Sequence, residues 1–128
     1  MRLLVHVEGQ TERQFVNEVL RGHLLANGYQ SVAARVIGNA GRQVGIRSWA
    51  DARKDIIGHL KEDPACIATT MVDYYGLPAK KGRAWPGREK ATLLRSEQRA
   101  QCVEQALMDD VSADMGDPRR FVPFCRDA

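Results

Sequence analysis

Short apolar segments alternate with longer segments of helical periodicity along this chain of 128 residues. The short segments are rich in apolar and β-branched residues and predict strands at 2–7, 31–37, 66–72 and 120–124. Apolar residues that recur every three or four positions predict helices at 11–27, 48–62 and 92–115. Strands that alternate with helices form a mostly parallel sheet with right-handed crossovers. We therefore expect an α/β fold, a Rossmann-type sheet of about four strands flanked by helices, in one domain over residues 1–128.

Local signals set the ends of the predicted helices. Thr11 and Gln14 have the spacing of a capping box at the start of the first helix. Ser48 is the expected N-cap of the second helix. Asp63-Pro64 should end that helix, because proline disfavours a helical conformation in the residue before it.

Composition excludes several classes of protein. Hydrophobic residues make up 44% and charged residues 27% of the chain, which excludes a disordered protein. No apolar stretch approaches the roughly 18 residues of a membrane helix, and the first apolar segment is too short for a signal-peptide core. We therefore expect a cytoplasmic protein without a membrane partner. Cys66, Cys102 and Cys125 show no CxxC spacing and predict reduced thiols rather than disulfides or a thiolate metal site.

Positive charge is concentrated in one segment. The whole chain has a net charge of +3, whereas residues 80–99 alone carry seven basic and two acidic residues. The predicted loop 74–90 holds five of these cations around Trp85, namely Lys80, Lys81, Arg83, Arg88 and Lys90. Such a loop predicts contacts to a nucleic-acid backbone, with Trp85 stacking on a base. The alternative is a solvated loop whose cations only maintain solubility.

Two acidic residues, Glu8 and Asp73, directly follow the first and third predicted strands. If the strand order is 2-1-3, these strands are neighbours and the two carboxylates meet across one strand spacing of about 5 Å. Two carboxylates with water suit Mg²⁺. The alternatives are that Glu8 is a solvated turn residue and that Asp73 caps the next turn. Glu12 is expected to be a first-turn acid stabilised by the helix dipole.

The histidines and the remaining glycine-rich loop give weaker signals. His6 in the first strand and His23 in the first helix are expected to pack in the core, and His59 to lie on the solvent side of the second helix. The loop 38–45 lacks the lysine and hydroxyl of a phosphate-binding P-loop and predicts a flexible connection.

Two motifs in order carry a family resemblance. Val7-Glu-Gly-Gln-Thr-Glu12 and Asp73-Tyr-Tyr-Gly-Leu-Pro78, followed by Pro86-Gly87 and the 116–124 stretch, resemble a bacterial family of unknown function related to the Toprim fold. Toprim domains occur in topoisomerases, primases and nucleases that accompany ATPases in phage defence. The resemblance implies a nuclease dependent on Mg²⁺ or Mn²⁺ that acts on DNA or RNA. It implies that Glu8 is a general acid or base or a metal ligand, and that Asp73 binds the metal.

The chain departs from the family pattern in two ways. Tyr75 stands where Toprim domains have a second metal-binding aspartate, and a phenol is a poor Mg²⁺ ligand. Relatives continue into further helical sequence, so we expect residues 1–128 to lack their C-terminal extension. Asp117 offers another carboxylate, although a turn role before Pro118 is favoured. These departures leave an alternative function: a non-catalytic module that binds nucleic acid, or that docks on an ATPase or on a second copy of itself.

Overall fold

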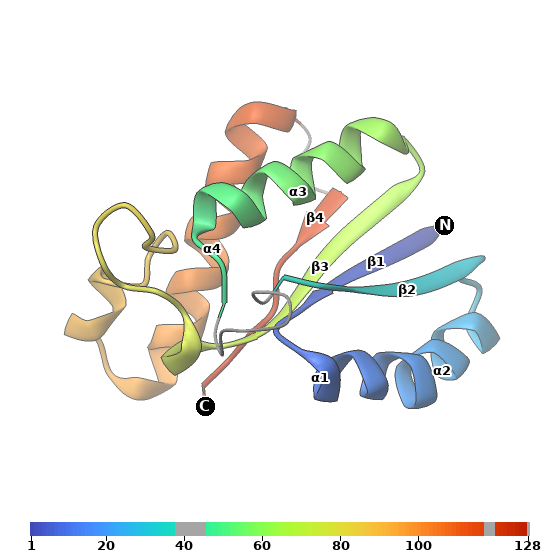
Figure 1. The fold of residues 1–128 in the computed structure, drawn as a ribbon, viewed down its shortest axis with the longest axis horizontal. Helices are drawn as coiled ribbons and strands as arrows, with labels where there is room; N and C mark the ends of the chain where they lie inside the picture. Colours follow the sequence, from blue (N-terminus) through green and yellow to red (C-terminus); the bar gives the residue numbers. More distant parts are fainter. Residues whose placement is uncertain (38–45, 117–119, 128) are drawn as a thin grey trace.

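The computed structural model describes residues 1–37, 46–116 and 120–127, and its centre is a sheet of parallel strands (Figure 1). The strand order is β2-β1-β3-β4, and β5 also pairs with β3. The strands are β1 (Arg2–Val7), β2 (Ser31–Val36), β3 (Cys66–Asp73), β4 (Phe121–Val122) and β5 (Cys125–Arg126). All pairings among these strands are parallel. The expected Rossmann-type α/β sheet is confirmed, and its strands have the 2-1-3 order that makes β1 and β3 neighbours.

Helices cover both faces of the sheet (Figure 1). The helical segments are α1 (Gln10–Phe15), a π-helical segment (Val16–Leu20), α2 (Arg21–Ala26), α3 (Trp49–Glu62), α4 (Ser96–Met115) and two 3₁₀ turns (Tyr74–Gly76 and Lys90–Leu93). The first three follow one another without a break over residues 10–26 and pack beside β2. Helices α3 and α4 pack on the other face, against β3 and the strands at its edge.

The two faces of the sheet have separate cores because successive side chains of a strand point to opposite sides. Val5 and Val7 of β1 join Val16 and Val32 in a small core beneath the first helical stretch. The side chain between them, His6, is fully buried. The larger core gathers apolar residues of α3, α4 and β3, with Ala68 and Val72 from the strand. Strand β3 buries every second residue, namely Cys66, Ala68, Thr70 and Val72.

The ends of the helices match the sequence only in part. Ser48 caps α3 as expected, because its Oγ accepts a hydrogen bond from the Asp51 N–H at 3.4 Å. The predicted capping box is wrong: the N-cap of α1 is Gly9, with no side-chain hydrogen bond, and Thr11 lies inside the first turn. Helix α4 begins at Ser96 rather than at residue 92, since the 3₁₀ turn Lys90–Leu93 precedes it.

The predicted last strand, 120–124, is only partly formed: β4 ends at Val122, before Pro123, which has no N–H to donate to the sheet. A second short strand, β5, follows beyond the predicted range. Thr70 of β3 bridges the gap. Its Oγ1 donates to the Phe124 carbonyl and accepts from the Phe124 N–H, both at 2.9 Å. This double contact holds the chain against β3 and places Arg126 beside the end of that strand.

Candidate functional site

Three carboxylates meet at the carboxyl edge of the sheet. Glu8 directly follows β1, Asp73 is the last residue of β3, and these strands are paired in parallel. Glu12 joins them from the first turn of α1. One carboxylate oxygen from each of Glu8, Glu12 and Asp73 lies within 4.8 Å of the other two. We call these three residues the acid cluster.

The structure thus brings together the two residues that the sequence singled out, and it adds a third. The sequence predicted Glu12 as a first-turn acid that the helix dipole stabilises. The signal that could have found it is its spacing of four residues from Glu8 across a glycine at the helix start. Asp117, the other candidate acid, and the loop 38–45 lie outside the described residues.

The turn after β3 packs directly against the acid cluster. A Cβ atom placed on Gly76 would lie 3.3 Å from Glu8 Oε1 and 3.6 Å from Oε2. The first distance is shorter than ordinary van der Waals contact, so a side chain at Gly76 would require the Glu8 carboxylate to shift by a few tenths of an ångström. Glycine at this position therefore leaves room for the Glu8 side chain.

The environment of Glu8 favours its protonated form. Burial raises the pKa of Glu8, the negative charges of Asp73 and Glu12 raise it further, and the positive charge of Arg126 opposes them. Glu8 therefore keeps its proton to a higher pH than an exposed glutamate does. Carboxyl groups with a raised pKa are suited to general acid and base chemistry near neutral pH.

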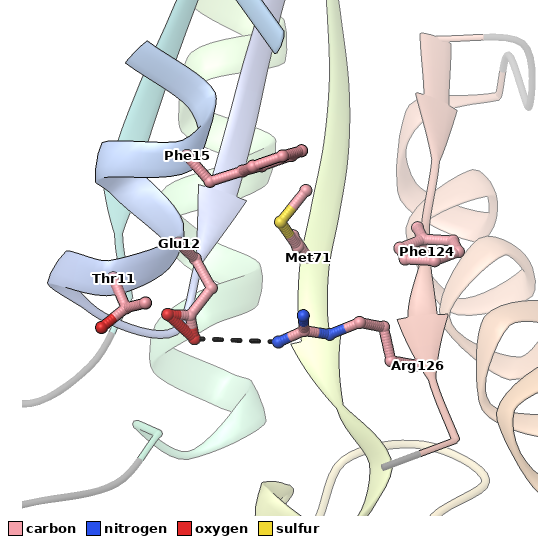
Figure 2. Close-up of a pocket in the computed structure, with 6 residues that line it drawn as sticks. All are labelled: Thr11, Glu12, Phe15, Met71, Phe124 and Arg126. Carbon is pink, nitrogen blue, oxygen red and sulfur yellow. Dashed lines mark ion pairs between the residues drawn. The ribbon is translucent and has the colours of Figure 1, made fainter. Parts of the chain in front are cut away.

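Arg126 of β5 places a guanidinium beside the acid cluster. Its Nε lies 2.5 Å from Asp73 Oδ1. Its Nη2 lies 4.0 Å from Glu12 Oε1, and Figure 2 shows this ion pair. The guanidinium balances part of the negative charge that the three carboxylates bring together. Sequence reasoning missed Arg126, since its position in the site depends on how the split last strand pairs with β3.

A cavity of about 660 Å³ opens beside Arg126 and Glu12. Figure 2 shows its lining residues, which are Thr11, Glu12, Phe15, Met71, Phe124 and Arg126. The rings of Phe15 and Phe124 border it and remain 44% and 47% exposed. The cavity therefore combines an apolar wall with a charged pair, and its volume is in the range of ligand pockets.

The predicted basic loop has two kinds of cation. Lys80, Lys81, Arg83 and Lys90 are exposed, as nucleic-acid contacts require. Arg88 is half-buried instead: its guanidinium lies 4.2 Å from the centre of the Tyr74 ring, and Nη1 donates to the Tyr74 hydroxyl at 3.0 Å. These contacts give Arg88 a packing role in the turn after β3.

The prediction that Trp85 stacks on a base is wrong. Its side chain is 1% exposed, because it packs in the larger core. The centres of the Trp85 and Trp49 rings are 4.9 Å apart. Nε1 of Trp85 donates to the Arg47 carbonyl at 3.0 Å. Trp85 is therefore a core residue, although several cations lie near it in the sequence. Its one polar atom is satisfied by a backbone carbonyl.

Tyr75 adds no carboxylate to the acid cluster. Its side chain is 57% exposed, and its hydroxyl accepts a hydrogen bond from Arg99 Nη1 of α4 at 2.8 Å. The third acid of the site comes from Glu12 instead of a second aspartate after β3.

Two of the three histidines differ from expectation. His23 is exposed on α2 rather than packed. His59 is half-buried, and its ring centre lies 5.7 Å from that of His6, so it is not on the solvent side of α3. His6 is buried as expected.

A family model described as "Domain of unknown function (DUF4276)" matches residues 7–127. The chain belongs to this family. The matched range includes every residue of the acid cluster and Arg126, so the site lies within the DUF4276 domain. Comparison with curated proteins and with solved structures gives no significant match. Among the described helices of this DUF4276 chain, none is long and apolar enough to cross a membrane.

Proposed function

We propose that this DUF4276 domain is a nuclease that hydrolyses phosphodiester bonds in DNA or RNA with Mg²⁺ or Mn²⁺. The observation that carries the proposal is the acid cluster, with carboxylate oxygens of Glu8, Glu12 and Asp73 within 4.8 Å of one another. Carboxylate oxygens are preferred ligands of Mg²⁺, which needs few protein ligands because it keeps several waters. The donor set therefore fits this cation.

Each residue of the site has a role in this proposal. Asp73 and Glu12 would hold the cation, and Glu8 would either share it or move the proton of the attacking water. The cation, when bound, supplies positive charge that stabilises the phosphate as negative charge develops on it. Burial of Glu8 raises its pKa with or without a metal, whereas a bound cation would oppose the effect of the Asp73 and Glu12 charges.

The exposed cations of the 74–90 loop support a polyanionic substrate. Lys80, Lys81, Arg83 and Lys90 follow β3, whose end carries Asp73. Lysine and arginine side chains bind the phosphate backbone by replacing its counterions, which makes such binding sensitive to salt.

Arg126 competes with the cation for Asp73, so we expect the guanidinium to move toward the substrate phosphate when the metal binds.

The biological setting rests on the family resemblance alone. The paired motifs around Glu8 and Asp73 resemble a bacterial family of unknown function related to the Toprim fold. Toprim domains occur in nucleases that accompany ATPases in phage defence, and we propose such a cytoplasmic role here.

One observation favours a second candidate, a non-catalytic module that binds nucleic acid or docks on an ATPase. The guanidinium of Arg126 already neutralises part of the acid cluster, and the exposed rings of Phe15 and Phe124 beside it suit contact with another protein. In that case the acid cluster and Arg126 form a structural ion pair and bind no metal.

The deciding experiment measures cleavage of DNA and RNA with Mg²⁺ and with Mn²⁺, together with calorimetric binding of each cation. Glu8→Gln and Asp73→Asn should abolish cleavage. The matched controls Glu18→Gln and Asp109→Asn change exposed acids outside the cluster and should cleave like the wild type. Cleavage that survives both cluster variants would contradict the proposed function. Salt-sensitive binding of nucleic acid with no calorimetric response to either cation would favour the non-catalytic module.

A further inference from the structure

A second group of potential metal ligands lies between the sheet and α3. His6 of β1 is fully buried on this face, and Asp55 and His59 are four residues apart on α3. Residues with this spacing share one side of a helix. One ligand atom from each of His6, Asp55 and His59 lies within 4.8 Å of the other two. None of these residues belongs to the acid cluster.

Three imidazole nitrogens of this group are buried without a hydrogen-bond partner among the described residues. Neither Nδ1 nor Nε2 of His6 has a partner in the described part of the chain, although the side chain is 0% exposed. Nδ1 of His59 is likewise buried without one. Buried polar atoms are nearly always satisfied, and a neutral imidazole offers a nitrogen lone pair to a metal. The unpaired His6 ring next to His59 and Asp55 therefore points to a missing ligand.

The surroundings of His6 and of Asp55 lower the pKa of both side chains. Burial, with the charge of His59 as a smaller contribution, lowers the pKa of His6 to about 4. His6 is therefore neutral at physiological pH, which is the form that binds metals. Burial disfavours the Asp55 anion, but the hydrogen bond and charge of Arg35 outweigh it and lower the pKa of Asp55.

Arg35 also orients the carboxylate. Its Nε donates to Asp55 Oδ2 at 2.6 Å, and Nη2 donates to Oδ1 at 3.2 Å. Carboxylates that bind metals are commonly held by an outer hydrogen-bond partner of this kind, and each oxygen keeps a further lone pair. Arg35 thus fixes Asp55 without using all of its acceptor sites.

Two members of the group, Asp55 and His59, border a groove that is open to solvent. A groove of about 400 Å³ runs along α3 and is bordered by Asp55 and His59. Asp51 and Glu62 also line this groove and would attract a cation to it, while Lys54 and Arg47 oppose them. An ion can therefore reach His59 and Asp55 without opening of the core.

We propose that His6, Asp55 and His59 bind a divalent transition-metal ion of the Zn²⁺ class. Two imidazoles and one carboxylate suit Zn²⁺ and its first-row neighbours, whereas Mg²⁺ prefers oxygen ligands. Three protein ligands leave one tetrahedral position for water. The proposal is independent of the nuclease function, since it uses different residues and a different class of metal.

Titration with Co²⁺, a spectroscopic substitute for Zn²⁺, tests the site in the chelator-treated full chain. We expect one equivalent to bind with visible absorption bands of a tetrahedral or five-coordinate ion, and Zn²⁺ to displace it while Mg²⁺ does not. His59→Gln and Asp55→Asn should each weaken binding by about 100-fold or more, beyond the usual 10–100-fold effect of an outer-shell partner. Circular dichroism checks that both variants are folded.

Matched controls separate this site from other ligands. His23→Gln removes an exposed histidine and Asp109→Asn an exposed aspartate, and both should bind Co²⁺ like the wild type. Binding should also persist in the Glu8→Gln/Asp73→Asn variant, in which the proposed nuclease site is lost. Absence of stoichiometric binding, unchanged affinity in folded His59→Gln, or a thiolate charge-transfer band would each overturn the proposal.

Discussion

The Arg126 guanidinium contacts the Asp73 carboxylate, with Nε 2.5 Å from Oδ1. The contact joins β5 to the end of β3 and sets a protein cation where the proposed metal would bind. The charge balance of the acid cluster is therefore a competition between this guanidinium and any divalent ion, and that competition can be measured.

Arg126→Met keeps much of the side-chain volume and removes the charge. We expect Mg²⁺ to bind the variant about tenfold or more tightly, because the competing cation next to Asp73 and Glu12 is gone. Without metal, the free energy of unfolding should fall by about 0.2–1 kcal/mol, the usual range for a partly exposed ion pair. Calorimetric titration and urea unfolding measure the two effects.

Arg2→Met is the matched control for this experiment. Arg2 bonds Asp63 at the other end of β1, and the exposure of this pair is close to that of Arg126 with Asp73. The Arg2→Met variant should bind Mg²⁺ with the same affinity as the wild type. An equal change in affinity in both variants would show that Arg126 does not compete for the site.

Gly76→Ala tests the packing of the turn against Glu8. The new Cβ would lie 3.3 Å from Glu8 Oε1, so the carboxylate must shift by a few tenths of an ångström. We expect a loss of about tenfold in kcat of the proposed nuclease, since catalytic groups tolerate little displacement, with the melting temperature nearly unchanged. Gly22→Ala, which meets nothing within 4 Å, should keep full activity. Full activity in Gly76→Ala would contradict a direct role for Glu8.

Gly87→Ala tests how the basic loop is attached to α4. Gly87 has φ +78°, and a Cβ there would lie 3.0 Å from the Cys102 carbonyl oxygen and 3.2 Å from Val103 Cα. We expect urea unfolding to show a loss of about 2–4 kcal/mol from backbone strain and overpacking combined. Gly82→Ala, with φ +87° and open space around it, should lose only about 1–2 kcal/mol. Equal losses would mean that the contact with α4 is unimportant.

The lowered pKa of His6 predicts that the folded protein loses stability in mild acid. Because burial lowers its pKa to about 4 in the folded chain, the unfolded chain binds a proton first as pH falls below about 6.5. The free energy of unfolding of metal-free protein should therefore fall between pH 6.5 and 4, by up to about 3 kcal/mol. Above pH 6.5 this contribution is constant, since His6 is neutral in both states.

Urea unfolding at successive pH values in the presence of a chelator measures this slope. His23→Gln should retain it, because His23 is exposed. His6→Gln should reduce it even if the variant is less stable overall. A flat profile in the wild type between pH 6.5 and 4 would refute the lowered pKa.

The sequence predicted the fold and two of the site acids because both follow from strand ends. Alternation of strands and helices indicates a parallel sheet, and residues directly after neighbouring strands, such as Glu8 and Asp73, then share its carboxyl edge. That inference needs only element order, which hydrophobic periodicity reports well.

The residues that sequence reasoning misjudged depend on contacts between distant segments. Trp85 is buried because Trp49 and the Arg47 carbonyl receive it, and nothing near it in the sequence shows this. Arg126 reaches Asp73 only because Pro123 splits the last strand and Thr70 holds the chain beyond it. His59 was predicted on the solvent side of α3, but its ring lies beside that of His6. The sequence does not show that a polar side chain is buried on the face of the sheet that α3 covers.

The pairing of Arg126 with Asp73 also has a consequence for biosynthesis. These residues are 53 positions apart, and the strand pair β1–β3 that assembles the acids is complete in the sequence well before Arg126 is translated. On the ribosome, the three carboxylates can therefore gather before the guanidinium that balances them has been made. Because the contact with Asp73 can form only after Arg126 has been made, full ordering of this sheet edge should be a late step in folding. Divalent cations that bind the acid cluster during translation would then promote the ordering of this sheet edge.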